Sequence, residues 1–166
     1  MKNKEQLLKL LGSEKLQFSV TDHEPLFTVE DSKSLRGQIE GGHSKNLFLK
    51  DQKDHFFLVS FIEDITADLK KLPEMLKSKK LSFAKFNYLQ NLMGIEPGSV
   101  SPFGLINDKN KVINFFFDEA FLRFDVVNFH PLVNTATVSI SPRDLINFIE
   151  KYHKKVNIFD MEKFRK

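Results

Sequence analysis

The sequence contains no cysteine and no tryptophan, and only two of its 166 residues are tyrosine. Without cysteine, the chain can form no disulfide, no thiolate metal site and no cysteine nucleophile. That absence fits the reducing cytoplasm, where we expect the protein to work. No stretch approaches the 18 uninterrupted apolar residues of a membrane helix, and residues 1–5 lead into an amphipathic pattern rather than a signal peptide. We therefore expect no membrane partner.

The standard catalytic signatures are also missing. There is no glycine-rich dinucleotide loop, no phosphate loop ending in Gly-Lys-Ser/Thr, no His-Glu-x-x-His and no Gly-x-Ser-x-Gly. The five histidines show no metal-ligand spacing, and no cysteine stands beside them. We expect neither a metal nor another cofactor.

Phenylalanine is plentiful, with 18 residues, and indicates a Phe-rich core. A length of 166 residues, 41% of them hydrophobic, favours one domain over residues 1–166. The net charge of +3 permits a polyanionic partner without requiring one. Positive residues gather at Lys77–Lys85 and at 151–166, which is typical either of solvated surface or of a phosphate-contacting patch.

Local patterns predict interspersed helices and strands, and hence an α/β domain with an antiparallel or mixed sheet. The predicted helices cover 3–12 (capped by Asn3 with Gln6), 28–37 (a capping box from Thr28), 66–78 (interrupted by Pro73), 86–94, and the residues after Ser141-Pro142. The predicted strands cover 18–22, a hairpin of 47–49 with 56–59, a second hairpin of 105–106 with 112–117, then 124–127 and 135–140.

Three polar segments adjoin these apolar strands. In Gly41–Asn46, a lysine at a strand entrance, Lys45, can direct an ammonium group toward a phosphate, or simply be solvated. In Gly98–Gly104, glycines let the backbone approach a ligand, although an ordinary loop has the same composition. In Phe129–Thr135, a His-Pro pair holds His130 extended, in either a binding or a structural role.

Together these segments resemble the bacterial prolyl-tRNA synthetase editing domains and their freestanding, YbaK-like relatives. The resemblance covers nearly the whole chain and rests on several motifs in order rather than on one. They are residues 23–30 (HEPLFTVE), 43–51 (HSKNLFLKD), 97–108 (PGSVSPFGLIND, with the family's G-x-x-x-P loop) and 129–134 (FHPLVN). The last two are most similar to the freestanding, alanine-specific branch.

The resemblance implies a single compact α/β fold in which a mixed, mainly antiparallel, barrel-like sheet is flanked by helices. It also implies deacylation of mischarged tRNA, with alanyl-tRNA(Pro) as the substrate of this branch. The partner would be the acceptor end of tRNA(Pro) carrying alanine, and docking to prolyl-tRNA synthetase stays open.

The family's functional lysine corresponds to Lys45, which would bind a phosphate near the terminal adenosine. Asn46 and His130 would bind or orient the aminoacyl group or the ribose, with His130 a weaker candidate for a general base. The loop residues are expected to border the ester carbonyl, with backbone amides as donors: Gly98, Ser99, Val100, Ser101, Pro102 and Gly104. Val20 and Phe129, apolar neighbours of the polar segments, would limit the pocket size.

No nucleophile with an adjacent base is visible in the sequence, so we expect direct attack by water, helped by a ribose hydroxyl. Three alternatives stay open. The chain could act on cysteinyl-tRNA(Pro) or another small mischarged product. It could be a non-catalytic module that binds tRNA or a synthetase. It could also be a small-molecule binding domain unrelated to tRNA.

Overall fold

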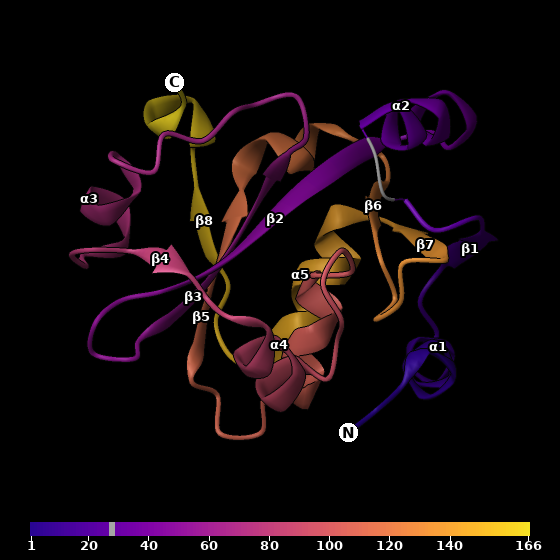
Figure 1. The fold of residues 1–166 in the computed structure, drawn as a ribbon. Helices are drawn as coiled ribbons and strands as arrows, with labels where there is room; N and C mark the ends of the chain where they lie inside the picture. Colours follow the sequence, from indigo (N-terminus) through magenta and orange to yellow (C-terminus); the bar gives the residue numbers. More distant parts are fainter. Residues whose placement is uncertain (27–28) are drawn as a thin grey trace.

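The computed structural model describes residues 1–26 and 29–166 (Figure 1). These residues form strands β1 (Phe18–Asp22), β2 (Gly42–Lys50), β3 (Phe56–Ile62), β4 (Ser82–Phe83), β5 (Ile113–Asp118), β6 (Val127–Phe129), β7 (Ala136–Ile140) and β8 (Asn157–Phe159). The α-helices are α1 (Lys4–Ser13), α2 (Val29–Gln38), α3 (Leu72–Leu76), α4 (Phe86–Met93) and α5 (Pro142–Tyr152). Three 3₁₀ helices complete them: η1 (Pro102–Asn107), η2 (Glu119–Arg123) and η3 (Met161–Phe164).

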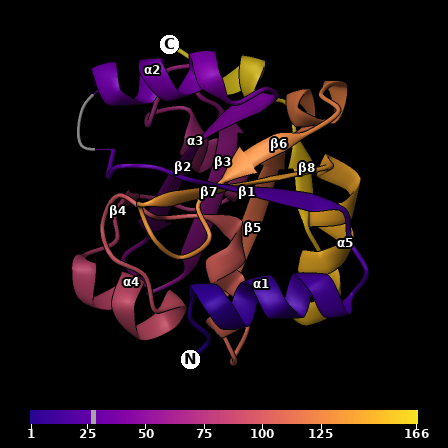
Figure 2. The same cartoon turned by 90° about the vertical axis from the view of Figure 1, so that its right-hand side faces the viewer.

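The strands form one mixed sheet in the order β1-β7-β6-β2-β3-β5-β8, and β4 pairs with β2 outside this order. Pairing is antiparallel for β1–β7, β6–β7, β2–β3 and β2–β4, and parallel for β2–β6, β3–β5 and β5–β8. Strands β1 and β8 are the two ends of this order. The sheet is strongly curved, because β1, β7 and β6 run across the direction of β2, β3 and β5 (Figure 2). This curved sheet with flanking helices confirms the expected fold class.

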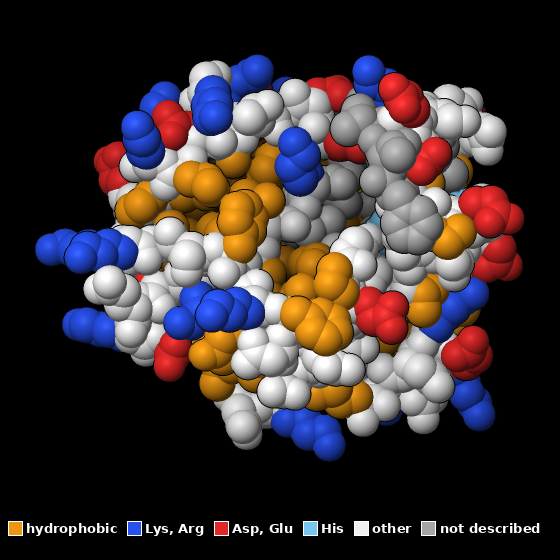
Figure 3. Space-filling view, in the orientation of Figure 1, with side chains coloured by type: hydrophobic (Ala, Val, Ile, Leu, Met, Phe, Trp, Pro, Cys, Tyr) orange, Lys and Arg blue, Asp and Glu red, His pale blue; other side chains and the backbone are white. Residues whose placement is uncertain are grey.

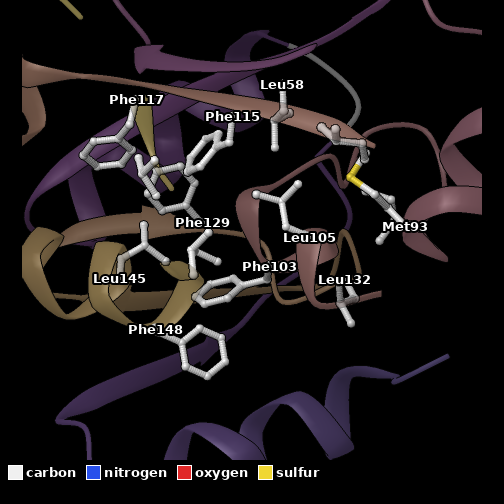
Figure 4. Close-up of a cluster of buried hydrophobic side chains, with 14 of the residues drawn as sticks. Leu58, Met93, Phe103, Leu105, Phe115, Phe117, Phe129, Leu132, Leu145 and Phe148 are labelled. Carbon is white, nitrogen blue, oxygen red and sulfur yellow. The ribbon is translucent and has the colours of Figure 1, made fainter. Parts of the chain in front are cut away.

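The main core lies between the two halves of the sheet and is rich in phenylalanine, as predicted (Figure 4). Phe117 of β5 packs against Phe129 of β6 with ring centroids 6.4 Å apart, and against Phe121 of η2 at 4.6 Å. Helix α5 contributes Leu145 and Phe148 to the same core. A second cluster on the other face of β2 and β3 packs against α3 and η3.

Several local predictions are confirmed at the level of single hydrogen bonds. The Gln6 backbone N–H donates to Asn3 Oδ1 (3.0 Å) and the Asn3 N–H donates to Gln6 Oε1 (2.9 Å), which completes the capping box of α1. Ser141 Oγ accepts from the Asp144 N–H (3.1 Å) and caps α5. Gly94 ends α4 with a φ of +64°, in the left-handed region that favours glycine. The predicted cap of α2 at Thr28 lies outside the described residues.

Other predictions were wrong. Residues 105–106 are not a strand of a second hairpin but part of η1, because Ser101 and Pro102 start a helical turn there; β5 pairs in parallel with β3 instead. In 66–78 only Leu72–Leu76 is α-helical, and Pro73 stands in its first turn, where a missing N–H costs nothing, rather than interrupting a longer helix. The strand expected at 124–127 begins only at Val127. The short strands β4 and β8 were not predicted.

Helices long and apolar enough to span a membrane are absent from residues 1–26 and 29–166.

Candidate functional site

A small pocket opens where β2 passes from one neighbour to the next. Strand β2 pairs with β6 only at Gly42 and His43, and with β4 only at Leu49 and Lys50. The stretch between these pairings borders a cavity of about 70 Å³. We call this cavity the polar pocket, and its lining residues are Leu26, His43, Ser44, Asn46, Glu63, Asn128, Phe129, His130 and Thr137.

A chain of hydrogen bonds orients Asn46 at the wall of the pocket. Buried Ser60 donates its hydroxyl to Asn46 Oδ1, and Asn46 Nδ2 donates to Ser44 Oγ at 3.2 Å. Ser44 Oγ in turn donates to the Asn128 carbonyl at 2.9 Å. Because an amide nitrogen carries two hydrogens, Asn46 Nδ2 keeps one N–H for a ligand. The Asn46 side chain is therefore pre-oriented as a donor.

His130 presents a neutral imidazole. Its Nδ1 lies 2.8 Å from the Ala136 carbonyl, which can only accept, so Nδ1 carries the hydrogen and Nε2 carries the lone pair. Burial lowers the pKa of His130, and the nearby His23 ring, 6.1 Å away, lowers it further, although the bond to Ala136 opposes both. At neutral pH the ring is thus a hydrogen-bond acceptor at Nε2, as a general base or a positioning group requires.

The pocket also holds a hydroxyl beside an imidazole, which sequence reasoning did not find. Thr137 Oγ1 lies 2.9 Å from His23 Nε2, although the two residues are 114 positions apart. His23 Nδ1 lies 2.8 Å from the Glu24 carbonyl and must donate to it, so Nε2 accepts from the threonine. The pair polarises the Thr137 hydroxyl.

The loop at 98–102 adjoins the pocket through Ser101. Ser101 Oγ donates to the His130 carbonyl at 2.6 Å and accepts from the Phe103 N–H at 3.2 Å. The Ser99 N–H already donates to the Glu96 carbonyl, so it has no hydrogen left for an ester carbonyl. Within the described parts of the chain, the amides of Gly98, Val100 and Ser101 remain as candidate donors.

The loop also borders a second cavity of about 460 Å³, lined by Ser99 and Asn134 among others. Pro25 lines this second cavity and Leu26 lines the polar pocket, so the segment 25–26 lies between the two hollows. Asn134 Nδ2 donates to the Leu26 carbonyl at 3.1 Å and fixes this segment.

Eight of the eleven predicted site residues do not line the polar pocket; they are the loop residues Gly98, Ser99, Val100 and Ser101, and Pro102, Gly104, Lys45 and Val20. Gly104 is buried in η1, where an added Cβ would come within 2.9 Å of Met93, so helix packing accounts for this glycine; Pro102 is buried at the start of the same helix. Lys45 is exposed and leaves β2 on the face opposite to Ser44 and Asn46. Val20 pairs with Val138, on the face opposite to Thr137.

The structure therefore gathers Asn46, Phe129 and His130 in one pocket and joins Ser101 to it. Sequence reasoning missed the other lining residues: Leu26, His43, Ser44, Glu63, Asn128 and Thr137. One signal could have found some of them, because Ser60, Asn128 and Thr137 are polar interruptions of otherwise apolar strands. A buried polar residue in such a strand needs partners, and several such residues indicate a shared network. In the described segments, no three His, Asp or Glu side chains are grouped to hold a metal ion.

Comparison with known proteins identifies the family. Residues 23–148 match the model of the aminoacyl-tRNA editing domain. The chain is 33% identical over 151 residues to the prolyl-tRNA editing protein ProX of Acetoanaerobium sticklandii, covering 90% of this chain and 92% of that one. It is 33% identical over 150 residues to the prolyl-tRNA synthetase associated domain-containing protein 1 of Mus musculus, covering 87% and 88%.

Among solved structures, a candidate trans-editing enzyme for prolyl-tRNA synthetase superimposes with a TM-score of 0.72 at 17% identity, covering 97% of this chain and 98% of the other. That likeness concerns the fold, whereas the sequence matches extend over most of the chain. The resemblance predicted from the motifs is thereby confirmed. The chain belongs to the aminoacyl-tRNA editing domain family and is an aminoacyl-tRNA deacylase.

Proposed function

We propose that this deacylase removes alanine from mischarged proline tRNA and that the ester is cleaved at the polar pocket. The editing protein of Acetoanaerobium sticklandii is named for prolyl-tRNA, which supports the choice of tRNA. We further propose that residues 1–166 act as one editing unit in the cytoplasm. Docking to prolyl-tRNA synthetase belongs to the same hypothesis, because the mouse relative is named as a prolyl-tRNA synthetase associated domain-containing protein.

The size of the pocket is the observation that carries this proposal. Its volume is about 70 Å³. A cavity that accommodates benzene has a volume of about 150 Å³. The polar pocket therefore suits a methyl side chain and not a ring. Phe129 is 2% exposed within the core, so this wall cannot retreat without disturbing the packing of β6.

A small editing pocket corrects an error that the synthetase for proline tRNA cannot avoid, namely the attachment of alanine. A site built for proline cannot strongly reject alanine, because missing methylenes are worth only about 1–3 kcal/mol. A second site that excludes proline by size can then hydrolyse the alanyl product. The discrimination comes from steric exclusion, for which buried Phe129 is the candidate wall.

Hydrolysis requires a water, an acceptor for its proton and donors for the carbonyl oxygen. We assign the acceptor role to His130 Nε2, acting on water directly or through a ribose hydroxyl. The amides of Gly98, Val100 and Ser101 are assigned to the developing oxyanion. The second N–H of Asn46 Nδ2 would bind the aminoacyl group or the ribose. Lys45 is exposed and forms no ion pair within the described residues, so its ammonium can bind a phosphate.

The Thr137–His23 pair offers a different first step, in which the hydroxyl attacks the ester and His23 takes its proton. We favour attack by water because Thr137 is only 3% exposed. The Thr137→Val variant separates the two routes. Attack by water predicts that this variant hydrolyses the ester within about tenfold of the wild-type rate. A covalent route predicts loss of turnover, and an alanyl-enzyme adduct in the wild type after acid quench.

The function is tested by single-turnover deacylation of a panel of mischarged tRNAs. We expect alanyl-tRNA(Pro) to be cleaved and prolyl-tRNA(Pro) to be spared. Cysteinyl-tRNA(Pro) decides between the two nearest specificities, because the cysteine side chain adds only a sulfur atom. The Lys45→Ala and Asn46→Ala variants test the assigned site. A near wild-type rate with Lys45→Ala would remove Lys45 from it.

A further inference from the structure

An exposed aromatic and basic surface lies at strand β4, which pairs with the same strand β2 that borders the polar pocket. Phe83 and Phe86 are 57% and 48% exposed, whereas most phenylalanines of this chain lie in its two cores. Residues 75–95 include four lysines and no acidic residue. We call Lys79, Lys80, Phe83, Lys85 and Phe86 the β4 surface. Figure 3 shows hydrophobic side chains on this side of the molecule, with Lys and Arg along their edges.

The β4 surface is joined to the polar pocket by strand β2. Phe83 is the register partner of Leu49, and the Ala84 N–H donates to the Phe48 carbonyl at 2.9 Å. Asn46 of the pocket lies three residues before Leu49, which is about 10 Å along a strand. A chain bound at β4 can therefore continue into the pocket along the edge of β2.

The Phe83 side chain points to the same face of the sheet as that of Lys45. Directly paired residues of antiparallel strands share a face, and so do alternate residues of one strand. Phe83 thus shares a face with Leu49, Leu47 and Lys45. Along β2, Lys45 follows Leu49 and Leu47 on this face, and it is the direct neighbour of Ser44 and Asn46, whose side chains line the polar pocket on the other face. One ligand that passes both features would meet an aromatic ring first and an ammonium next.

The lysines of the β4 surface are not neutralised by acidic side chains of the described residues. In the part of the chain that the structure describes, Lys79, Lys80 and Lys85 form no ion pair with an acidic side chain. The nearby Lys50 differs, because its ammonium lies 2.8 Å from Asp54 and over the Tyr88 ring. Three uncompensated ammonium groups beside exposed rings favour a polyanion with flat groups, and disfavour a neutral protein surface.

Resting on the function proposed above, we propose that the β4 surface binds the single-stranded 3′ end of the tRNA. Phe83 and Phe86 stack on bases, and Lys79, Lys80 and Lys85 neutralise phosphates. Single-stranded nucleic acid is bound by this combination, because every base has a π face and every nucleotide a phosphate. The surface thereby delivers the terminal ribose to the pocket.

A direct binding assay tests the surface without relying on catalysis. Because the chain has no tryptophan, Phe83→Trp introduces a single fluorescent reporter. We expect its emission to be quenched by uncharged tRNA(Pro) and by a short oligoribonucleotide ending in CCA. Phe83→Ala should weaken binding of either RNA by about five- to a hundredfold. Phe83→Leu should lose nearly as much, since leucine is apolar but has no π face.

The lysines are tested through salt. Replacing Lys79, Lys80 and Lys85 by glutamine should reduce the slope of log affinity against log salt by about 2, at about 0.7 per phosphate contact. The control is Lys155→Gln with Ile158→Ala, which removes one exposed lysine and one 45% exposed apolar side chain near β8, on the opposite edge of the sheet. The control should leave the affinity unchanged.

The possible outcomes test the RNA-binding role of the β4 surface independently of the proposed deacylase function. Quenching, weaker binding by Phe83→Ala and a reduced salt slope support the surface, whatever the deacylation panel shows. Unchanged tRNA affinity in the Phe83 and lysine variants overturns it, even if the wild type deacylates alanyl-tRNA(Pro). Loss of self-association or of synthetase binding in the Phe83 variants, with tRNA affinity intact, also overturns it. Failure of wild-type deacylation counts only against the proposed function.

Discussion

Replacing His130 by asparagine and by glutamine distinguishes a structural role of this residue from a catalytic one. In the wild type, His130 Nδ1 lies 2.8 Å from the Ala136 carbonyl oxygen. The amide nitrogen of asparagine lies near the position of Nδ1 and can still donate to this carbonyl. It has no atom at the position of Nε2. The glutamine side chain reaches that position with a polar group but does not reproduce the ring geometry. The two variants therefore remove different parts of one side chain.

The expected magnitudes differ enough to be told apart. A hydrogen bond such as that to Ala136 contributes about 0.5–1.5 kcal/mol to stability, and His130→Asn keeps it. A positioned acid–base group contributes about 10²–10⁴ in rate. We therefore expect His130→Asn to unfold in urea within about 1 kcal/mol of the wild type, yet to deacylate alanyl-tRNA(Pro) at least about a hundredfold more slowly.

The pH dependence of His130 gives an independent check. Its folded pKa lies below the usual histidine value of 6.5. Between the folded and the unfolded pKa, the unfolded state binds a proton that the native state does not. Stability is thus highest above pH 6.5 and falls as the pH drops toward the folded pKa, a loss that His130→Asn should remove. Deacylation should likewise persist somewhat below pH 6.5. An asparagine variant with a rate within about threefold of the wild type would refute the role of Nε2.

Three further predictions concern the scaffold. His153→Ala removes the side-chain partner of buried Asp108, whose Oδ2 lies 2.8 Å from His153 Nε2, and leaves the carboxylate only the amides of Val112 and Ile113. We expect a loss of about 1–3 kcal/mol of unfolding free energy in urea. Burial alone would raise the pKa of Asp51, but hydrogen bonds from Ser78, His55 and the Lys53 amide lower it. The ionised Asp51 should therefore stabilise the fold above pH 4, and this contribution should be lost in stronger acid. Asp51→Asn should flatten the acid part of the plot of unfolding free energy against pH. Gly104→Ala should destabilise by about 1–3 kcal/mol in thermal or urea melts, because its Cβ would come within 2.9 Å of both the Cβ and the Sδ of Met93.

The Phe83 experiments also bear on how the substrate reaches the pocket. If the β4 surface binds the 3′ end, its loss should appear in the dependence of deacylation on tRNA concentration. Loss of Asn46 or His130 should appear at saturating tRNA instead. Comparing the two kinds of variant tests whether binding and cleavage are divided between the two ends of β2.

Local signals explain which elements could be predicted. The capping box of Asn3 and Gln6, the Ser141-Pro142 start of α5 and the Gly94 stop of α4 depend on residues a few positions apart, and all three are observed. The hairpin assigned to 105–106 failed because a short apolar run is equally compatible with a strand or a buried turn of helix. Packing of Gly104 against Met93 favours the helix, and this contact is invisible to a local pattern.

The sequence by itself determined the family, the α/β class and the candidates Asn46, Phe129 and His130, because motifs and caps are encoded over a few neighbouring residues. Only the tertiary structure decided which faces these side chains occupy. Strand register turned Lys45 and Val20 away from the pocket, and a contact across 114 residues brought Thr137 to His23. Side chains alternate between the faces of a strand, so a site formed by several strands depends on pairings that no single segment specifies.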